Sequence, residues 1–191
     1  MYSKSFLFTV LTIFLMNWQT TARNAAAPDS ERARILVAYF SATGTTARVA
    51  RQLAEATGGD LYAITPVEPY TDDDLDWNDR RSRSSVEMND PNARPAIREV
   101  RDMTGYDVVF IGYPIWWNLA PRIIETFIER HDLTGKTVIP FATSGGSGIA
   151  NSAAALRKAY PELDWQEGRL LRAADGQTVR EWLDGAGYLL P

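Results

Sequence analysis

The chain has 191 residues, of which 45% are hydrophobic and 23% charged, so it is long enough for one globular domain with a sizeable core. The formal net charge is -4 and no block of Lys and Arg is present, which argues against nucleic-acid binding. There is no cysteine and a single histidine, His131, which excludes disulfides and thiol nucleophiles and leaves little material for a metal site or a catalytic triad. A bound cofactor would have to carry any demanding chemistry.

Residues 1–27 have the layout of a secretory signal peptide. Lys4 precedes an apolar run over residues 6–16, and small residues gather before Ala27. The run is shorter than the roughly 20 residues that a membrane-spanning helix needs. We therefore expect cleavage after Ala27, no stable membrane span in the mature chain, and a periplasmic or secreted protein. The alternative is that Met16 is the true start, which would make the protein cytoplasmic.

From residue 34 onward, apolar runs typical of buried strands alternate with apolar residues at helical spacing. Gly58 and Gly59 end the first helix as a C-cap. The predicted strands cover residues 35–40, 61–64, 108–111 (closed by Gly112 and Pro114), 137–142 and, more weakly, 165–171. The predicted helices cover residues 45–57 and 150–160, a segment that begins at Pro121, and a last segment around 179–183.

Strands that alternate with helices predict an α/β fold, with a mostly parallel sheet and helices on both faces. Pro140 falls inside a predicted strand, although proline cannot donate to a β-ladder. Such sheets bind ligands beyond the carboxyl ends of their strands, where the strand order reverses. The loops that follow Phe40, Gly112 and Ala142 are therefore the candidates for a binding site.

Residues 70–95 interrupt this alternation. Thr71 precedes three acidic residues, and three arginines come later, a pattern that suits a helix with Thr71 as its N-cap. The favoured interpretation is a solvated surface helix, and a charged docking site is the alternative.

The loop after the first strand is suited to holding an anion. Hydroxyl donors come from four side chains, Ser41, Thr43, Thr45 and Thr46. Gly44 lets the backbone turn tightly, and the helix that starts at Thr45 adds free N–H groups and the positive end of its dipole. The loop is neither a Walker motif nor a GxGxxG fingerprint, so we predict a phosphate cradle for a ligand other than an NTP or a dinucleotide. An ordinary capped helix start is the alternative.

Two adjacent tryptophans follow the third strand, in the segment Gly112-Tyr-Pro-Ile-Trp-Trp-Asn-Leu-Ala-Pro121. Because neighbouring strand residues point to opposite faces, Trp116 and Trp117 cannot both be core residues of a regular strand. We expect at least one indole to face solvent or a flat aromatic ligand that stacks on it. The alternative is a Trp pair that seals the adjacent helix.

The loop after the fourth strand is Thr143-Ser-Gly-Gly-Ser-Gly148, and its small residues expose backbone groups that can hydrogen-bond the edge of a heterocycle. Gly/Ser clusters usually form ordinary loops, so the composition alone is a weak indication of a binding site. The indication is stronger here because this loop is the third that follows a predicted strand. Together the three loops favour a ligand with a terminal phosphate and a planar ring. Flavin mononucleotide (FMN) has both.

These residues resemble the flavodoxin family. The segment Ser41-Ala-Thr-Gly-Thr-Thr46 is similar to its Thr/Ser-x-Thr-Gly-x-Thr phosphate loop, and residues 106–117 and 140–148 resemble a bacterial flavodoxin-like subfamily with a Tyr-Pro-Ile-Trp-Trp loop. The likeness covers residues 34–190. It implies a five-stranded parallel sheet in the order 2-1-3-4-5, noncovalently bound FMN, and electron transfer at the flavin.

The resemblance also implies roles for the loop residues. The phosphate would be held by Ser41, Thr43, Gly44, Thr45 and Thr46. Trp116 falls where flavodoxins place an aromatic against the isoalloxazine ring, and its loop neighbours in the site are Pro114, Ile115, Trp117 and Asn118. The polar edge of the ring would be lined by Thr143, Ser144, Gly145, Gly146 and Ser147. No side chain is needed as an acid, a base or a metal ligand.

Two features depart from the family pattern. Flavodoxins commonly have a small residue just after that aromatic, so that a peptide can flip toward N5 of the reduced flavin, and here Trp117 and then Asn118 stand there. A bulky residue resists a positive φ, whereas Asn tolerates it. The second ring-stacking aromatic, usual in the third loop, is missing, which leaves Trp117 or Tyr70 to replace it.

The favoured function is an electron carrier whose partners are redox proteins or small electron acceptors. The first alternative is an NAD(P)H-dependent, FMN-containing quinone or nitro-compound reductase, for which the missing aromatic would leave an open flavin face. The second alternative is a binding module without flavin, in which residues 70–95 dock a partner.

Overall fold

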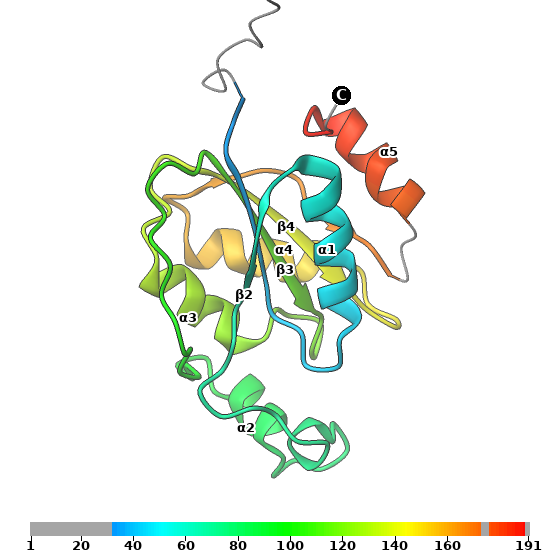
Figure 1. Cartoon of the computed structure of the whole chain (residues 1–191). Helices are drawn as coiled ribbons and strands as arrows, with labels where there is room; N and C mark the ends of the chain where they lie inside the picture. Colours follow the sequence, from blue (N-terminus) through cyan, green and yellow to red (C-terminus); the bar gives the residue numbers. More distant parts are fainter. Residues whose placement is uncertain (1–31, 173–175, 190–191) are drawn as a thin grey trace, which may run out of the picture. The chain divides into compact units, whose positions relative to one another are not determined.

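The computed structural model describes residues 32–172 and 176–189, which are built around a parallel sheet (Figure 1). The strands are β1 (Ile35–Tyr39), β2 (Asp60–Ala63), β3 (Val108–Pro114), β4 (Thr137–Thr143), β5 (Asp164–Trp165) and β6 (Arg169–Leu170). They lie in the order β2-β1-β3-β4-β5, β6 also pairs with β4, and all of these pairs are parallel. The predicted α/β class and the predicted 2-1-3-4-5 order are confirmed.

Helices cover both faces of this sheet. They are α1 (Thr45–Thr57), α2 (Arg83–Asn89), α3 (Arg122–Arg130), α4 (Ala150–Ala159) and α5 (Gly176–Ala186), together with a short 3-10 helix, η2 (Asp73–Leu75). Helices α1 and α5 lie on one face, and α3 and α4 lie on the other (Figure 1). The sheet is therefore the middle layer of three.

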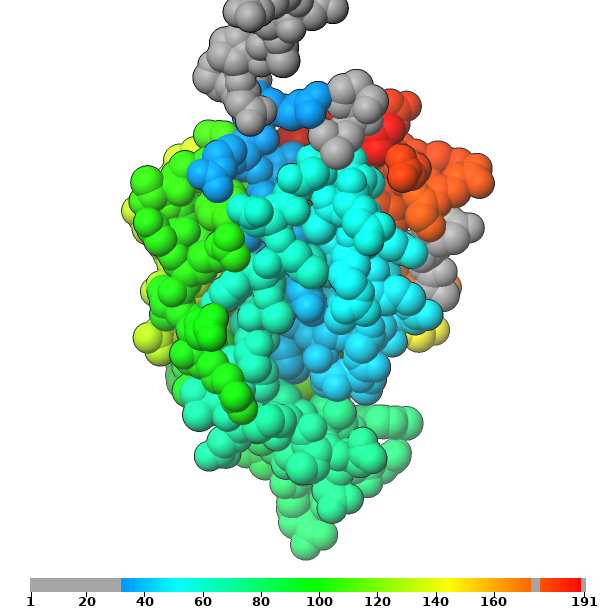
Figure 2. All heavy atoms as spheres, viewed as in Figure 1, coloured from blue at the N-terminus to red at the C-terminus, as the bar shows by residue number. Residues whose placement is uncertain are grey.

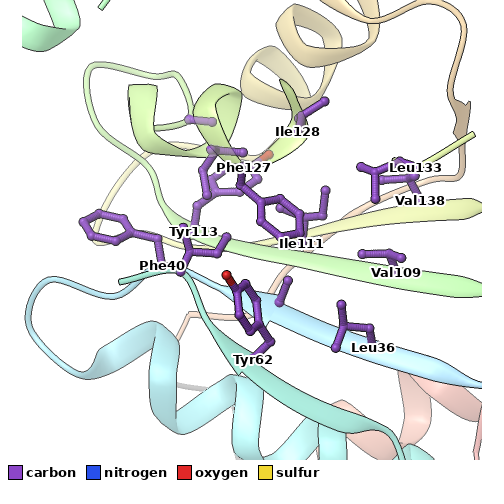
Figure 3. Close-up of a cluster of buried hydrophobic side chains, with 14 of the residues drawn as sticks. Leu36, Phe40, Tyr62, Val109, Ile111, Tyr113, Phe127, Ile128, Leu133 and Val138 are labelled. Atoms are coloured by element: carbon purple, nitrogen blue, oxygen red, sulfur yellow. The ribbon is translucent and has the colours of Figure 1, made fainter. Parts of the chain in front are cut away.

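The alternation of side chains along β1 divides the core between the two faces. Leu36 and Ala38 belong to the cluster under α3 and α4, whereas Ile35 and Val37 belong to the cluster under α1 and α5. Figure 3 shows the first cluster, in which Phe127 of α3 lies against the sheet. A strand buried on both faces needs a continuous apolar run, which is the pattern that predicted β1.

The predicted weak strand over residues 165–171 is split in two, and the break explains the proline in β4. Trp165 pairs with Val138 and Arg169 pairs with Phe141, so the β5–β6 side has one residue more than β4 over this stretch, as in a β-bulge. Val138 and Ala142 accept hydrogen bonds from this side, so Pro140 between them faces it as well. The backbone nitrogen of Pro140, which carries no hydrogen, therefore faces the gap between β5 and β6. No ladder hydrogen bond to this nitrogen is needed there.

Strand β3 is longer than predicted, because Gly112 continues it instead of closing it. A Cβ atom on Gly112 would lie 2.1 Å from Cζ of Phe141 on the adjacent strand. Only a hydrogen atom fits beneath that ring, and this requirement for close packing, rather than a turn, explains the glycine. The extension carries the chain to Pro114 at the carboxyl edge of the sheet.

The segment over residues 70–95 is not one capped helix, so that prediction is wrong. Oγ of Thr71 accepts a hydrogen bond from the Asp74 N–H at 3.2 Å, and the Asp74 carboxylate accepts from the Thr71 N–H at 2.9 Å. This local pairing starts only the three-residue η2, and α2 begins separately after Ser82. The segment lies at the carboxyl end of the sheet and projects there in the space-filling view (Figures 1 and 2).

The predicted signal peptide over residues 1–27 lies outside the described residues. Among residues 32–172 and 176–189, no helix is long and apolar enough to cross a membrane. The same residues contain no group of acidic and histidine side chains that could hold a metal ion.

Candidate functional site

The loop between β1 and α1 forms an anion cradle without a basic side chain. Gly44, with φ of 87°, is the N-cap of α1, and its N–H donates to Oγ of Ser41 at 3.1 Å. The positive φ is a conformation that glycine adopts at no steric cost. Because the first N–H groups of a helix have no partner within it, the start of α1 presents donors and a positive dipole end to the space above the sheet.

The four hydroxyls of this loop have different surroundings. Among the described residues, the hydroxyls of Thr43 and Thr45 have no hydrogen-bond partner. Thr46 is fully buried, and its Oγ1 lies 2.8 Å from Oγ1 of Thr143 at the end of β4, which is also buried. One hydroxyl of this pair donates to the other, so the pair ties the first loop to the third and keeps one hydrogen to donate elsewhere.

Trp116 and Trp117 form part of a tight turn whose backbone departs from the expectation. The N–H of Trp116 donates to the carbonyl of Leu119 at 3.0 Å, and the N–H of Leu119 donates back at 2.9 Å. Both central residues have positive φ, 45° at Trp117 and 65° at Asn118, as in a type I′ turn. The expectation that a bulky residue resists positive φ is wrong for Trp117, because the two reciprocal bonds hold it there against a cost of about 1–2 kcal/mol.

The two indoles have separate roles in this turn. Trp116 is half-buried and packs edge-on against Phe40 and Tyr70, with ring centroids 5.6 and 5.4 Å apart. Trp117 is 46% exposed, which agrees with the expectation that at least one indole is not a core residue. Tyr70 therefore packs against Trp116 and lines neither of the two cavities described below.

The loop after β4 is held by one side chain. Oγ of Ser144 accepts hydrogen bonds from the N–H groups of Gly146 and Ser147, at 3.2 and 2.9 Å. A Cβ atom on Gly145 or Gly146 would meet nothing within 4 Å, so packing within the protein does not explain these glycines. They leave open space beside the loop, as a ligand that approaches the backbone would require.

The three loops meet at one cavity of about 540 Å³. It is lined by Thr43, Thr45, Pro114, Ile115, Trp116, Thr143, Ser144, Gly145 and Arg172. Of the other residues predicted for the site, Ser41, Thr46 and Trp117 line an adjoining cavity of about 400 Å³. Gly44, Asn118, Gly146 and Ser147 line neither cavity and shape the loops instead. The carbonyl of Asn118, for example, accepts from the Asn151 side chain of α4 at 3.0 Å.

Sequence reasoning missed five lining residues. Arg172 follows the last strand pair, and its guanidinium donates to the carbonyl of Gly146 at 3.4 Å. The rule that ligands bind beyond strand ends would have pointed to it, had the weak strand over residues 165–171 been followed to its end. The others line the adjoining cavity: Ala42 of the β1–α1 loop, and Leu75, Trp77 and Ser84 of the 70–95 segment. Nothing local in the sequence indicates that this segment reaches the site.

The chemistry of the two cavities is that of a binding site. Among the described residues that line them, Arg172 is the one charged side chain, and there is no Asp, Glu, His or Lys. Nearby, burial raises the pKa of the Tyr113 hydroxyl to about 12, so this group keeps its proton at neutral pH. The lining offers hydrogen-bond donors, the indoles of three tryptophans and backbone amides, but no acid or base, and a bound group would have to supply the reaction.

Comparisons with known proteins agree with this geometry. The sequence model of the flavodoxin family matches residues 34–186. A search of curated proteins gave no match.

Solved structures include two close relatives from Bacteroides. A proposed flavoprotein of Bacteroides eggerthii is 66% identical, with a TM-score of 0.79, and the match covers 82% of this chain and 99% of that one. A proposed flavoprotein of Bacteroides uniformis is 55% identical, with the same TM-score, and the match covers 80% and 99%. A flavoprotein of Lactobacillus acidophilus, solved in complex with FMN, shares the fold at 20% identity and a TM-score of 0.61, with 78% and 98% covered.

Proposed function

This chain belongs to the flavodoxin family, and we propose that it binds FMN noncovalently and transfers electrons through it. The observation that carries the proposal is that Thr43, Thr45 and Trp116 line one cavity. Its lining combines the unpaired hydroxyls of Thr43 and Thr45, at the start of α1, with the indole of Trp116. A molecule with a phosphate tail and a flat ring matches that distribution of donors and apolar surface.

The residues that would hold FMN divide into three groups. The hydroxyls of Thr43 and Thr45 and the N–H groups at the start of α1 would bind the phosphate, with Ser41 and Gly44 fixing the loop. Trp116, held by Phe40 and Tyr70, would present a fixed surface to the ring. The 143–147 loop and Arg172 would meet the polar edge of the ring, where the guanidinium favours negative charge. Bound FMN would supply one- or two-electron transfer.

The relatives support this assignment. Two proteins more than half identical to this chain carry the name flavoprotein, and the Lactobacillus protein holds FMN on the same fold. Redox proteins or small electron acceptors would be the partners. The signal peptide over residues 1–27 remains part of the proposal, and an intact mass of the protein from its natural host tests it.

The decisive experiment is a titration of the purified apoprotein with FMN and, in parallel, with riboflavin, which lacks the phosphate. We expect a yellow complex with FMN and quenching of the flavin fluorescence at micromolar or lower concentrations. The double variant T43V/T45V should weaken FMN binding by about 10-fold or more, because two donors to the phosphate are lost, and should change riboflavin binding little. Thr134→Val, at an exposed threonine of the opposite sheet edge, is the matched control.

The proposal fails if the wild-type protein takes up no FMN at micromolar concentrations. The assignment of the cradle fails if T43V/T45V weakens FMN and riboflavin equally.

A second candidate function is an NAD(P)H-dependent FMN reductase. It is favoured by the absence, among the described lining residues, of a second aromatic ring in the three-loop cavity, which would leave a flavin face accessible to hydride. Stopped-flow reduction of the FMN complex by NADPH separates the two functions. A carrier is reduced slowly, whereas a reductase is reduced within the time of a catalytic turnover.

A further inference from the structure

Tyr70 lines neither cavity, yet its ring contacts a side chain that lines both of them. The centroid of the Tyr70 ring lies 5.4 Å from that of Trp116 and 5.6 Å from that of Phe40. Phe40 belongs to the core under α3 and α4, whereas Tyr70 comes from the 70–95 segment. Among the described residues, the indole N–H of Trp116 has no hydrogen-bond partner. The tilt of the indole therefore depends on packing, and these two rings are its aromatic neighbours.

A carboxylate and a guanidinium hold the Tyr70 ring in place. The Tyr70 hydroxyl donates to the Glu87 carboxylate. The guanidinium of Arg83 lies over the face of the ring, 4.1 Å from its centroid, and Nε of Arg83 donates to Glu87 at 2.7 Å. Each of the three groups contacts the other two, and Arg83 and Glu87 are largely buried. Separating the pair would leave a poorly hydrated charge without its partner, so the cluster keeps one arrangement.

This cluster is tied to the body of the domain. Arg83 and Glu87 belong to α2, and Arg122 at the start of α3 donates to the carbonyl of Met88 in α2 at 3.3 Å. Arg122 also pairs with Glu125 at 2.8 Å within α3, whose apolar face packs on the sheet. A continuous set of contacts therefore leads from α3 through α2 to the Tyr70 ring, and from there to the indole of Trp116.

A second cluster of the same composition lies away from the cavities. The Tyr160 hydroxyl donates to the Glu129 carboxylate at 2.7 Å, and Glu129 pairs with Arg94 at 2.8 Å. Among the described residues, the Tyr160 ring has no aromatic neighbour, and no member of this cluster lines either cavity. The two clusters share their chemistry and differ in what the tyrosine ring contacts. The contact with Trp116 is thus the feature that separates Tyr70 from a purely structural tyrosine.

We propose that Tyr70 is a positioning residue for the flavin site. Held by Glu87 and Arg83, it sets the tilt of the Trp116 indole on which a flat ring would stack. The inference rests on the proposed function in one respect, because the ring of FMN is assigned to the cavity that Trp116 lines. It gives the 70–95 segment a role in flavin binding that acts through another side chain.

The test compares Tyr70→Leu, Tyr70→Phe and the matched control Tyr160→Leu in the full chain, each titrated with FMN and with riboflavin. Tyr70→Leu removes the ring beside the indole, so it should weaken both flavins by the same factor, about 5-fold or more. Tyr70→Phe keeps the ring but loses the bond to Glu87, so its affinities should lie between those of the wild type and Tyr70→Leu. Tyr160→Leu should lower stability as Tyr70→Leu does and leave both affinities unchanged.

A second measurement needs no flavin. In apoprotein labelled with 5-fluorotryptophan, the fluorine resonance of Trp116 is assigned as the one that Trp116→Phe removes. We expect Tyr70→Leu to shift this resonance and Tyr160→Leu to leave it in place. Failure of the proposed function, a wild-type protein that takes up no FMN, is therefore a separate outcome, because the resonance still shows whether Tyr70 positions the indole.

Four results would overturn the inference. They are a Trp116 resonance that Tyr70→Leu does not move, a Tyr70→Leu variant that binds riboflavin as the wild type does, a Tyr160→Leu variant that weakens both flavins equally strongly, and a Tyr70→Phe variant that binds no better than Tyr70→Leu. The second result would leave Tyr70 acting, if at all, on the phosphate loop. The third would reduce its effect to general stability.

Discussion

The amino and carboxyl ends of the sheet differ in whether their polar side chains are hydrogen-bonded within the protein. At the amino end, Asp60, Tyr106 and Arg101 satisfy one another: the Tyr106 hydroxyl donates to Asp60 at 2.5 Å and accepts from Arg101 at 2.7 Å. At the carboxyl end, the hydroxyls of Thr43 and Thr45 have no partner among the described residues. Charged side chains take part in the network at the first end, whereas at the second Arg172 is the one charged side chain among the described residues that line the two cavities.

This difference separates structural polar groups from those kept for a ligand. A buried polar group that is already paired stabilises the fold, and a ligand would have to break that pairing to use it. Donors left unpaired at the mouth of a cavity contribute nothing to folding and are ready to bind. Polar variants at the amino end should therefore change stability, and variants of the unpaired hydroxyls at the carboxyl end should change binding.

The buried pair of Thr46 and Thr143 is the exception, and it gives the largest expected effect on stability. Replacing Thr143 with Val leaves the Thr46 hydroxyl buried without this partner, which should lower the free energy of unfolding by about 1–3 kcal/mol. Thr46→Val should do the same. The double variant removes both hydroxyls, so its loss should be smaller than the sum of the single losses. Urea denaturation of all four proteins completes the cycle, and strict additivity would mean that the two hydroxyls are not coupled.

The fold could be predicted from sequence where the signal is local. The apolar run of β1, the hydroxyl-rich turn after it and the glycine C-cap of α1 lie within 25 residues of one another, and each matches the structure. The parallel sheet followed from the alternation of strands and helices, and the strand order was implied by the resemblance alone. The positions of the three loops then followed from the rule that parallel strands share a carboxyl edge.

The rest depends on contacts between distant residues. The 70–95 segment joins the site through the packing of Tyr70 on Trp116, 46 positions apart in the sequence, and no local pattern encodes that contact. The positive φ of Trp117 is set by its turn partners, against its own preference. Arg172 lies within reach of the third loop after β6 resumes pairing with β4, beyond the bulge between Trp165 and Arg169.

The variant Tyr106→Phe tests whether the paired polar groups at the amino end stabilise the fold, and its expected effect on the free energy of unfolding is intermediate. Burial first, and then the hydrogen bond to Asp60, raise the pKa of the Tyr106 hydroxyl, which marks a group that stays protonated and donates. Loss of this hydroxyl should lower the free energy of unfolding by about 1 kcal/mol, because Asp60 keeps its two arginine partners. FMN affinity should not change. Tyr188→Phe removes a hydroxyl that has no hydrogen-bond partner among the described residues, and this control should cost nothing measurable. A large loss of FMN binding in Tyr106→Phe would contradict the division between the two ends.

The smallest expected effect is the pH dependence that His131 adds at the amino end. Burial lowers the pKa of this imidazole below its ordinary value of 6.5, and in the neutral form Nδ1 donates to the Phe127 carbonyl at 2.7 Å while Nε2 accepts from the Arg101 N–H at 3.0 Å. A pKa that is lower in the folded state means that the unfolded chain binds the proton first as the pH falls. The stabilisation is therefore complete above about pH 6.5 and is lost as the pH falls through the folded-state pKa.

His131→Gln removes this titration, and His131 is the one histidine of the chain. The difference in the free energy of unfolding between wild type and His131→Gln, measured in urea at pH 7.5 and pH 5, should shrink at the lower pH. The carboxylates titrate in both proteins, so their contribution cancels in that difference. A difference that stays constant across this range would mean that the imidazole is as easily protonated in the folded protein as in water, and the amino end would then not be a closed network.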